Sequence, residues 1–325
     1  MAGMDYKPIR LALGILKDSW QACFELFKVM IPIIIAVRVL QELGMISYLA
    51  VPLEPIMRLM GLPGSMGLVW ATALINNIYA GMIVLVSLPE SAQITIAQIT
   101  ILSTVMLVAH ALPVELKIAQ KSGSRLIFQG ITRVGSALLL GIILNLIYSH
   151  ADILQQPASI LWNPDPTPSG HINWAVSQIK NLAAIYGIIA SLMVIIRILD
   201  RFKITQFFIW LFRPLLKQMG IGKRAAPLSI IGMTMGLSYG GGLILHEIKK
   251  GDIPARDVFF SITLMGLCHS MIEDTLLMLL LGAHLSGILW ARLLYALLFT
   301  AVLVRMQSAA PKKFSQRFLY AGPAD

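Results

Sequence analysis

The sequence predicts an all-α polytopic membrane protein made of two inverted-topology repeats. Three observations carry this prediction: the composition, a set of long apolar windows, and an internal repeat. Hydrophobic residues make up 57% of the chain and charged residues only 13%, whereas an average soluble domain has about 25% charged residues. So little charge cannot cover the surface of a soluble globule, and no catalytic signature such as a phosphate-binding loop is present. We therefore expect a membrane protein that is not an enzyme.

Each spanning helix needs roughly 20 mostly apolar residues. Six windows meet this requirement: 26–48, 94–116, 127–149, 178–199, 257–279 and 285–305. Two further apolar stretches, 64–88 and 225–246, are interrupted by asparagines or glycines, which predicts re-entrant or broken helical hairpins. An amphipathic segment that contains proline precedes each hairpin, at 51–63 and 204–219, and we expect both segments to lie along the membrane interface. Each repeat thus has about three spanning helices, one interfacial helix and one hairpin.

The repeat appears when the sequence is shifted by 159 residues, without a gap. Matches between leucines are common in such a composition, but matches between rarer residues are not. The matched pairs include Arg38 with Arg197, Pro55 with Pro214, Gly61 with Gly220, Gly81 with Gly240, His110 with His269, Gly123 with Gly282 and Arg133 with Arg292. Glu115 falls on Asp274. These matches predict a duplicated membrane unit.

The distribution of charge predicts that the two copies have opposite orientations. The loop after 94–116 holds Lys117, Lys121 and Arg125, but the matching loop of the second copy has no Lys or Arg. Lys and Arg stay on the cytoplasmic side, so equivalent loops with opposite charge indicate inverted copies. The net charge of +10 then reports topology rather than a nucleic-acid partner.

This topology divides the chain into five parts in a bacterial inner membrane, with both termini in the cytoplasm. They are an N-terminal amphipathic segment (1–25), the first membrane repeat (26–149), an external linker (150–177), the second, inverted repeat (178–305) and a basic tail (306–325). Expected partners are membrane lipids and a small polar solute, and a homo-oligomer is left open.

The tips of the two hairpins offer uncharged polar groups near the middle of the membrane. Such interrupted segments in corresponding positions of two halves point to the substrate site of a transporter. The candidate solute-binding residues are Asn76, Asn77, Tyr79, Thr234, Ser238, Tyr239, Gly240 and Gly241. For the glycines, close packing between helices is an equal alternative.

Ionisable residues form a second candidate site, because a charge inside a membrane is costly and marks function. They are His110, Glu115, His269, Glu273 and Asp274. The set could relay a proton or bind a divalent cation. Alternatively, the histidines bond backbone carbonyls and the carboxylates reach the headgroups. Arg38 and Arg197 also fall in spans, where pairing with Glu42 and Asp200 is the main interpretation and anion binding the minor one.

One known family resembles this chain. The run SYLAVPLEPIMRLMGLPGSMGLVWATALINNIYAG (47–81) and its second copy FFIWLFRPLLKQMGIGKRAAPLSIIGMTMGLSYGGG (207–242) resemble the nucleoside recognition, or Gate, domain. Gate domains occur in ferrous-iron permeases, concentrative nucleoside transporters and spore maturation membrane proteins. The resemblance implies inverted repeats whose hairpins form a gate. The chain lacks a GTPase domain and clear nucleoside-binding motifs, so the resemblance implies neither GTP-driven iron uptake nor a nucleoside as ligand.

Three functions follow as hypotheses. The leading one is a secondary transporter for a small polar solute, for example a nucleoside-like molecule, held between the hairpins. It needs no cofactor beyond a coupling ion, H⁺ or Na⁺. The second is a divalent-metal permease that uses the His and carboxylate residues as ligands. The third is a membrane scaffold or assembly factor that does not transport.

Overall fold

The computed structural model describes residues 20, 23–24, 27–28, 31–36, 38–40, 42–88, 91, 93–161, 170–202, 204–222, 224–236, 253–309, 311 and 318–320. This part of the chain is helical, apart from turns, loops and two isolated β-bridges. The expected N-terminal segment 1–25 and tail 306–325 lie mostly outside the described residues, and so does the tip of the second hairpin.

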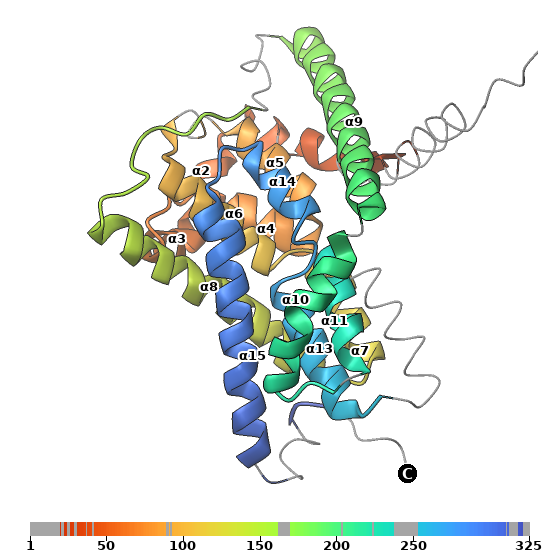
Figure 1. Ribbon diagram of the computed structural model, residues 1–325. Coiled ribbons are helices and arrows are strands. Elements are labelled where there is room, and N and C mark those ends of the chain that lie inside the picture. The colour runs from red at the N-terminus through yellow and green to blue at the C-terminus, as the bar shows by residue number, and fades with distance from the viewer. Residues whose placement is uncertain are drawn as a thin grey trace, which may run out of the picture.

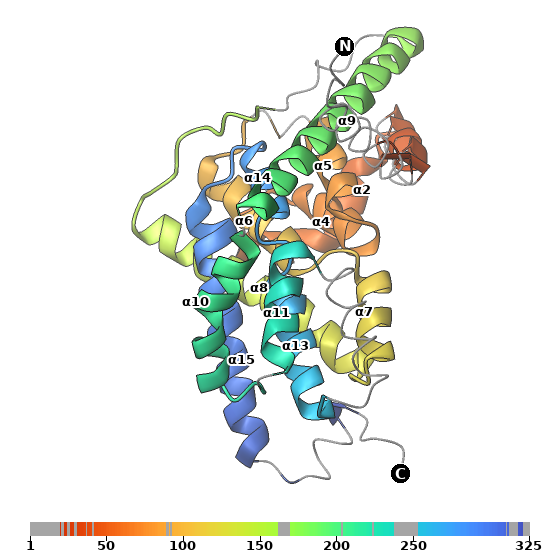
Figure 2. The ribbon, with the colours of Figure 1, turned by 45° about the vertical axis from the view of Figure 1, so that its right-hand side comes forward.

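Figures 1 and 2 show the helices of the two halves. The first half contains α2 (Met45–Ala50), η1 (Val51–Leu53), α3 (Glu54–Leu59), α4 (Met66–Ile75), α5 (Ile78–Ser87), α6 (Ile96–Val108), α7 (Leu112–Lys121) and α8 (Leu126–His150). The second contains α9 (His171–Arg201), α10 (Ile204–Gln218), α11 (Ala225–Met235), α13 (Ala255–Leu267), α14 (Glu273–Leu279), the π-helix η3 (Ser286–Ala291) and α15 (Arg292–Ala309).

Three helical stretches in the described part of the chain are long and apolar enough to cross a membrane. They are Ile96–Lys121, Leu126–His150 and Ser286–Ala309. Around them, α6 packs against α8, and α13 packs against α15. Because lipid is as apolar as these side chains, such packing stabilises through van der Waals contact rather than through transfer out of water.

Two of the predicted spans are not continuous helices. Window 94–116 is interrupted between α6 and α7, and window 257–279 between α13 and α14. Each break holds a residue with left-handed backbone, Ala111 and Ser270, both with φ of +46°. The backbone groups freed by the breaks find partners on neighbouring helices: Ala111 N donates to Ala73 O (2.9 Å) and Met271 N to Met233 O (2.8 Å). These two hydrogen bonds provide acceptors for backbone N–H groups at the breaks, as the interior of a membrane requires.

The predicted hairpin 64–88 consists of α4 and α5, which lie side by side (Figures 1 and 2). Gly81 sits at their contact, where an added Cβ would lie 2.9 Å from the Cβ of Ala73 and 3.1 Å from Val69 O. Gly81 thus allows close packing within the hairpin, which is the alternative role that the sequence left open for the glycines. The turn falls at Asn76 and Asn77, as the sequence predicts.

Local geometry recurs at the offset of 159 residues. The helix before each hairpin ends with the same reverse hydrogen bond, from Leu62 N to Met57 O (2.9 Å) and from Ile221 N to Leu216 O (3.0 Å). In each case the glycine just before the donor has positive φ, a conformation that costs other residues roughly 1–2 kcal/mol: +68° at Gly61 and +87° at Gly220. Equivalent sequence therefore adopts equivalent local structure.

Contacts between the two halves are reciprocal. The rings of Phe128 and Phe259 are in tilted contact, with centroids 5.4 Å apart. Gly287 and Thr100, which match these two residues at the offset of 159, are also in close contact. Likewise, the segment after α8 bonds the loop after α14, through Leu161 N to Leu280 O (2.9 Å). The segment after α15 bonds the loop after α7, through Arg125 N to Leu319 O (2.9 Å).

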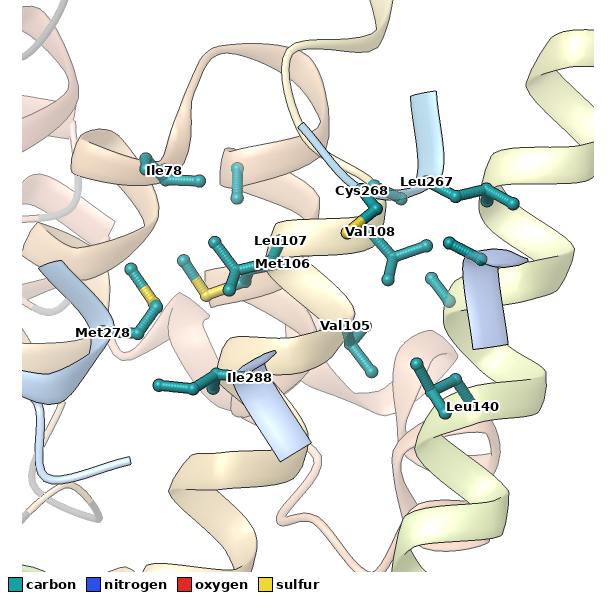
Figure 3. Close-up of a cluster of buried hydrophobic side chains, with 14 of the residues drawn as sticks. Ile78, Val105, Met106, Leu107, Val108, Leu140, Leu267, Cys268, Met278 and Ile288 are labelled. Atoms are coloured by element: carbon teal, nitrogen blue, oxygen red, sulfur yellow. The ribbon is translucent and has the colours of Figure 1, made fainter. Parts of the chain in front are cut away.

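The hydrophobic core takes side chains from both halves (Figure 3). The C-terminal turn of α6, from Val105 to Val108, lies at its centre. Ile78 of α5 and Leu140 of α8 pack there together with Leu267, Cys268, Met278 and Ile288 of the second half. The core thus surrounds the point where α6 and α13 break, and it fixes the positions of the side chains at these breaks.

Candidate functional site

The two helix breaks bring His110 and His269 face to face. Each ring places Nδ1 2.9 Å from the carbonyl oxygen four residues earlier, that of Met106 or Met265. The two Nε2 atoms lie 3.2 Å apart, and both side chains are buried, with 6% and 2% of their surfaces exposed. A residue and its repeat equivalent therefore meet in the core of the molecule.

The hydrogen bonds of the rings fix their tautomers. A carbonyl oxygen only accepts, so Nδ1 of each histidine carries the hydrogen. In two neutral rings, Nε2 then presents a lone pair, and the two lone pairs point into the same 3.2 Å gap. A proton on one Nε2 would let it donate to the other, and a cation bound by both nitrogens would also relieve the repulsion between the lone pairs.

Glu115 borders this gap on the side of the first half. Its Oε1 lies 3.2 Å from Nε2 of His269 and 3.6 Å from Nε2 of His110. Its Oε2 forms an ion pair with Nη1 of Arg133, and Arg133 Nε donates to Val108 O at 3.1 Å. Since both charges are buried, their pairing offsets much of the cost of desolvation.

Asp274 and Arg292 take the equivalent places in the second half. Arg292 donates from Nε to Leu267 O (3.1 Å) and from Nη2 to His269 O (2.8 Å). Within the part of the chain that the structure describes, Oδ2 of buried Asp274 and Nη1 of Arg292 have no hydrogen-bond partner. One atom each from His110, His269 and Asp274 lies within 4.8 Å of the other two. These three residues are able to hold a metal ion.

Glu273 lies next to this cluster and faces the first hairpin. Tyr79 of α5 donates to Glu273 Oε1 at 3.5 Å. A small cavity of about 10 Å³, less than one water molecule occupies in the liquid, borders Tyr79 and Leu277. The larger cavities of 720 and 650 Å³ lie beside α10 and beside the turn between α7 and α8. The residues that line these three cavities do not include His110, His269 or Asp274.

The predicted solute-binding residues fall into three groups. Asn76 ends α4 and is partly exposed, and Tyr79 reaches Glu273. Asn77 caps α5 by accepting from Ala80 N (2.9 Å), and Thr234 donates to Ile230 O (3.1 Å), so both side chains have bonds within the hairpins. The remaining four, Ser238, Tyr239, Gly240 and Gly241, lie outside the described residues.

Of the two arginines that the sequence analysis singled out in predicted spans, the side chain of one is described by the structure and that of the other is not. Nε of Arg38 lies 2.8 Å from Oε1 of Glu42, the ion pair that the main interpretation expects. The side chain of Arg197 is outside the described part of the structure. By contrast, the sequence assigned no role in the site to Arg133 and Arg292, although both were matched at the repeat offset. A paired arginine inside two predicted spans was the signal that could have revealed them.

Comparison with known proteins supports a membrane protein and goes no further. The chain is 27% identical over 298 residues to YvoD of Bacillus subtilis (strain 168), described as an uncharacterized membrane protein. The alignment covers 90% of this chain and 93% of that protein. No family model matches the chain, and no solved structure matches it. This chain is thus a helical membrane protein with a distant bacterial relative of nearly the same extent.

Proposed function

We propose that this chain is a secondary transporter of the bacterial inner membrane, which moves a small polar solute past the helix breaks. The contact between His110 and His269 carries this proposal, because two ionisable groups lie buried between the halves of a chain that we expect to span the membrane. Charged and titratable groups are rare at this depth, and they mark ion or substrate pathways. Discontinuous helices that meet at the midplane are typical of transporters.

An inverted arrangement of the halves supports the same mechanism. The contact of Phe128 with Phe259 and that of Gly287 with Thr100 are equivalent at the offset of 159 residues, as expected of two copies related by a two-fold axis. The basic loop of the first half and its uncharged equivalent in the second favour an axis in the membrane plane, with both termini in the cytoplasm. Such halves can rock about a fixed central site and expose it to each side in turn.

The resemblance to Gate domains agrees with a gating role for the hairpins. The hairpin α4–α5 contacts the cluster through Tyr79 and Glu273, so movement of the hairpin would change the surroundings of the histidines. Asn76 is partly exposed at the turn of this hairpin and is able to contact a passing solute. The histidines would then carry the coupling ion or bind the solute itself.

Uptake into proteoliposomes tests the proposal. The purified full-length chain is reconstituted, and a panel of radiolabelled nucleosides, amino acids and divalent cations is offered. The panel is repeated with His269→Gln and with His150→Gln. His150 is a matched control, because it has the same hydrogen bond to the fourth preceding carbonyl, that of Leu146 (2.8 Å), but is exposed on α8.

We expect at least one solute to enter with the unchanged chain and with His150→Gln, and its initial rate to fall at least tenfold with His269→Gln. The proposal is wrong if no solute of the panel enters faster than into protein-free liposomes. Equal uptake by His269→Gln and the unchanged chain would also exclude the cluster from the pathway.

A further inference from the structure

We propose that His110, His269 and Asp274 form a binding site for a divalent transition-metal ion. Their ligand atoms converge within 4.8 Å of one another in the core, where two helices of different halves break. That this ion is the transported solute is a second step, which rests on the function proposed above. The binding site itself does not depend on transport.

The spacing of the two nitrogens fits a shared ion. Imidazole nitrogens bind first-row metals at about 2.0–2.1 Å, so two of them on one ion stand roughly 2.8–3.4 Å apart for octahedral to tetrahedral angles. The two Nε2 atoms are 3.2 Å apart. The two nitrogens are therefore as far apart as two neighbouring ligands of one metal ion. The ion would lie to one side of the line that joins them.

The second hydrogen bond of each ring matches that of a metal ligand. Histidines that bind metals almost always donate the hydrogen of the other ring nitrogen to a carbonyl or carboxylate, which fixes the tautomer and the ring orientation. Here Nδ1 of His110 and His269 donates to Met106 O and Met265 O, each at 2.9 Å. Both Nε2 atoms are thereby prepared as ligands, with no rearrangement of the rings.

Asp274 supplies an independent indication of a missing partner. Its side chain is buried, with 6% of its surface exposed, and among the described residues Oδ2 has no hydrogen-bond partner. A buried carboxylate oxygen without a hydrogen-bond partner is energetically costly in an apolar core. A proton held between the two histidines would leave this oxygen without a partner. A cation that also contacts Asp274 would satisfy it.

The ligand set selects a class of ion. Imidazole nitrogens suit zinc, iron, nickel and copper, whereas magnesium and calcium prefer oxygen alone, so two histidines and one carboxylate select a first-row divalent metal. Three protein ligands leave at least one coordination position open for water. Arg292, which bonds His269 O at 2.8 Å, adds a positive charge beside the site. That charge weakens retention of the ion, as suits a site that must release it.

Metal titration of the full-length protein in nanodiscs tests the site. The protein carries a Strep tag in place of a polyhistidine tag, and Zn²⁺ and Co²⁺ binding are followed by calorimetry and by the visible absorption of Co²⁺. The variants are His269→Gln and Asp274→Asn, which keep the size of each side chain. The controls are His150→Gln and Glu54→Gln, at an exposed histidine and an exposed ion pair. Thermal unfolding without metal checks that each variant folds.

We expect one ion per chain, with an affinity at least tenfold lower in His269→Gln and Asp274→Asn and unchanged in both controls. No binding up to 1 mM, as an order-of-magnitude limit for a specific site, would overturn the proposal. Equal affinity in all variants would do the same, since it places the metal elsewhere. Mg²⁺ binding as tightly as Zn²⁺ would contradict the ligand set.

Uptake of radioactive Zn²⁺ and Mn²⁺ by proteoliposomes separates the two steps. Uptake that requires His269 and Asp274 supports the ion as solute. Binding without uptake of these ions leaves the site in place and refutes the ion as solute, while the nucleosides and amino acids of the panel still decide whether the chain is a transporter. Transport of another solute without metal binding would refute the metal site and leave the transporter in place.

Discussion

The two halves of the central cluster share one backbone design but use their charges differently. In the first half, Glu115 forms an ion pair with Arg133. In the second half, Asp274 is one methylene shorter, and its Oδ2 has no partner among the described residues. Arg292 instead donates to two backbone carbonyls, those of Leu267 and His269.

The different partners of the two carboxylates indicate different roles for them. The first half pairs Oε2 of its carboxylate with its own arginine, while Oε1 faces the histidine pair, 3.2 Å from Nε2 of His269. The second half holds its arginine on the carbonyls of the helix break and leaves a carboxylate oxygen available beside two histidines. Matching positions of the two halves thus share backbone geometry, while the second leaves a carboxylate oxygen without a hydrogen-bond partner among the described residues.

The largest expected effect comes from Glu115→Gln, compared with Asp274→Asn. Loss of the Glu115 charge leaves the Arg133 guanidinium buried without a counter-ion, which costs about 3–5 kcal/mol. Asp274→Asn replaces a carboxylate whose Oδ2 has no hydrogen-bond partner among the described residues, and we expect a loss below about 1 kcal/mol. Unfolding in mixed micelles with increasing SDS measures both. Equal losses for the two variants would contradict the proposed division between the halves.

Replacement of Arg292 measures how much the hydrogen bonds of this arginine contribute to stability in the second half. Arg292→Met leaves Leu267 O and His269 O without their donors, and each buried acceptor costs about 1–3 kcal/mol. We expect a loss of roughly 2–4 kcal/mol in the same unfolding assay. The control is Arg58→Met, which breaks an exposed pair with Glu54 and should cost at most about 1 kcal/mol. A loss at Arg292 no greater than at Arg58 would show that its bonds do not support the break.

Substitution of the equivalent glycines before the hairpins tests whether the two halves have the same backbone geometry and packing at these positions. Alanine at Gly61 or Gly220 is strained by roughly 1–2 kcal/mol because both have positive φ. At Gly61 the new Cβ would also overlap the side chain of Asn145, whereas at Gly220 the nearest atom belongs to Val304 at 3.3 Å. Gly61→Ala should therefore lower the unfolding temperature more than Gly220→Ala. The reverse order would contradict the packing described for the first half.

The smallest expected difference lies at the starts of α6 and α13. Thr95 accepts from Gln98 N (3.2 Å), and the Gln98 side chain accepts from Thr95 N (3.1 Å), which forms a capping box. The equivalent residue, Pro254, has no side-chain cap. We expect Thr95→Ala to cost about 1 kcal/mol and Pro254→Ala less, as measured by thermal unfolding. A greater loss at Pro254 would mean that the cap does not stabilise α6.

Sequence alone predicts much of this fold because its signals are local or repeated. The apolar windows, the turn at Asn76 and Asn77, and the separation of 159 residues between His110 and His269 are all visible in the chain. The match of two histidines at the repeat offset also predicts that they approach each other. Residue type and position along the chain suffice for these features, since lipid permits only a narrow range of backbone structures.

The helix breaks and the partners of the charges could not be predicted in this way. Ala109, Ala111 and Cys268 are small or apolar, so they read as parts of continuous spans. At the breaks, Trp70 Nε1 donates to Ala109 O (3.2 Å), Ala111 N donates to Ala73 O and Met271 N donates to Met233 O. Such tertiary contacts leave no trace in local composition. For the same reason, the pairing of Glu115 with Arg133 appears only once α7 and α8 are packed.

The sidedness of two equivalent residues tests most directly whether the halves meet in opposite orientations at the histidine pair. Arg125 and His284 occupy matching positions in the loops after α7 and α14, and both are exposed. Arg125→Cys and His284→Cys are each made in a chain that also carries Cys23→Ala and Cys268→Ala. The new cysteine is then labelled with a membrane-impermeant maleimide, in whole cells and in lysed cells. We predict that Cys at position 284 reacts in whole cells and Cys at position 125 only after lysis. Labelling of both positions from the same side would contradict inverted halves and the transport mechanism built on them.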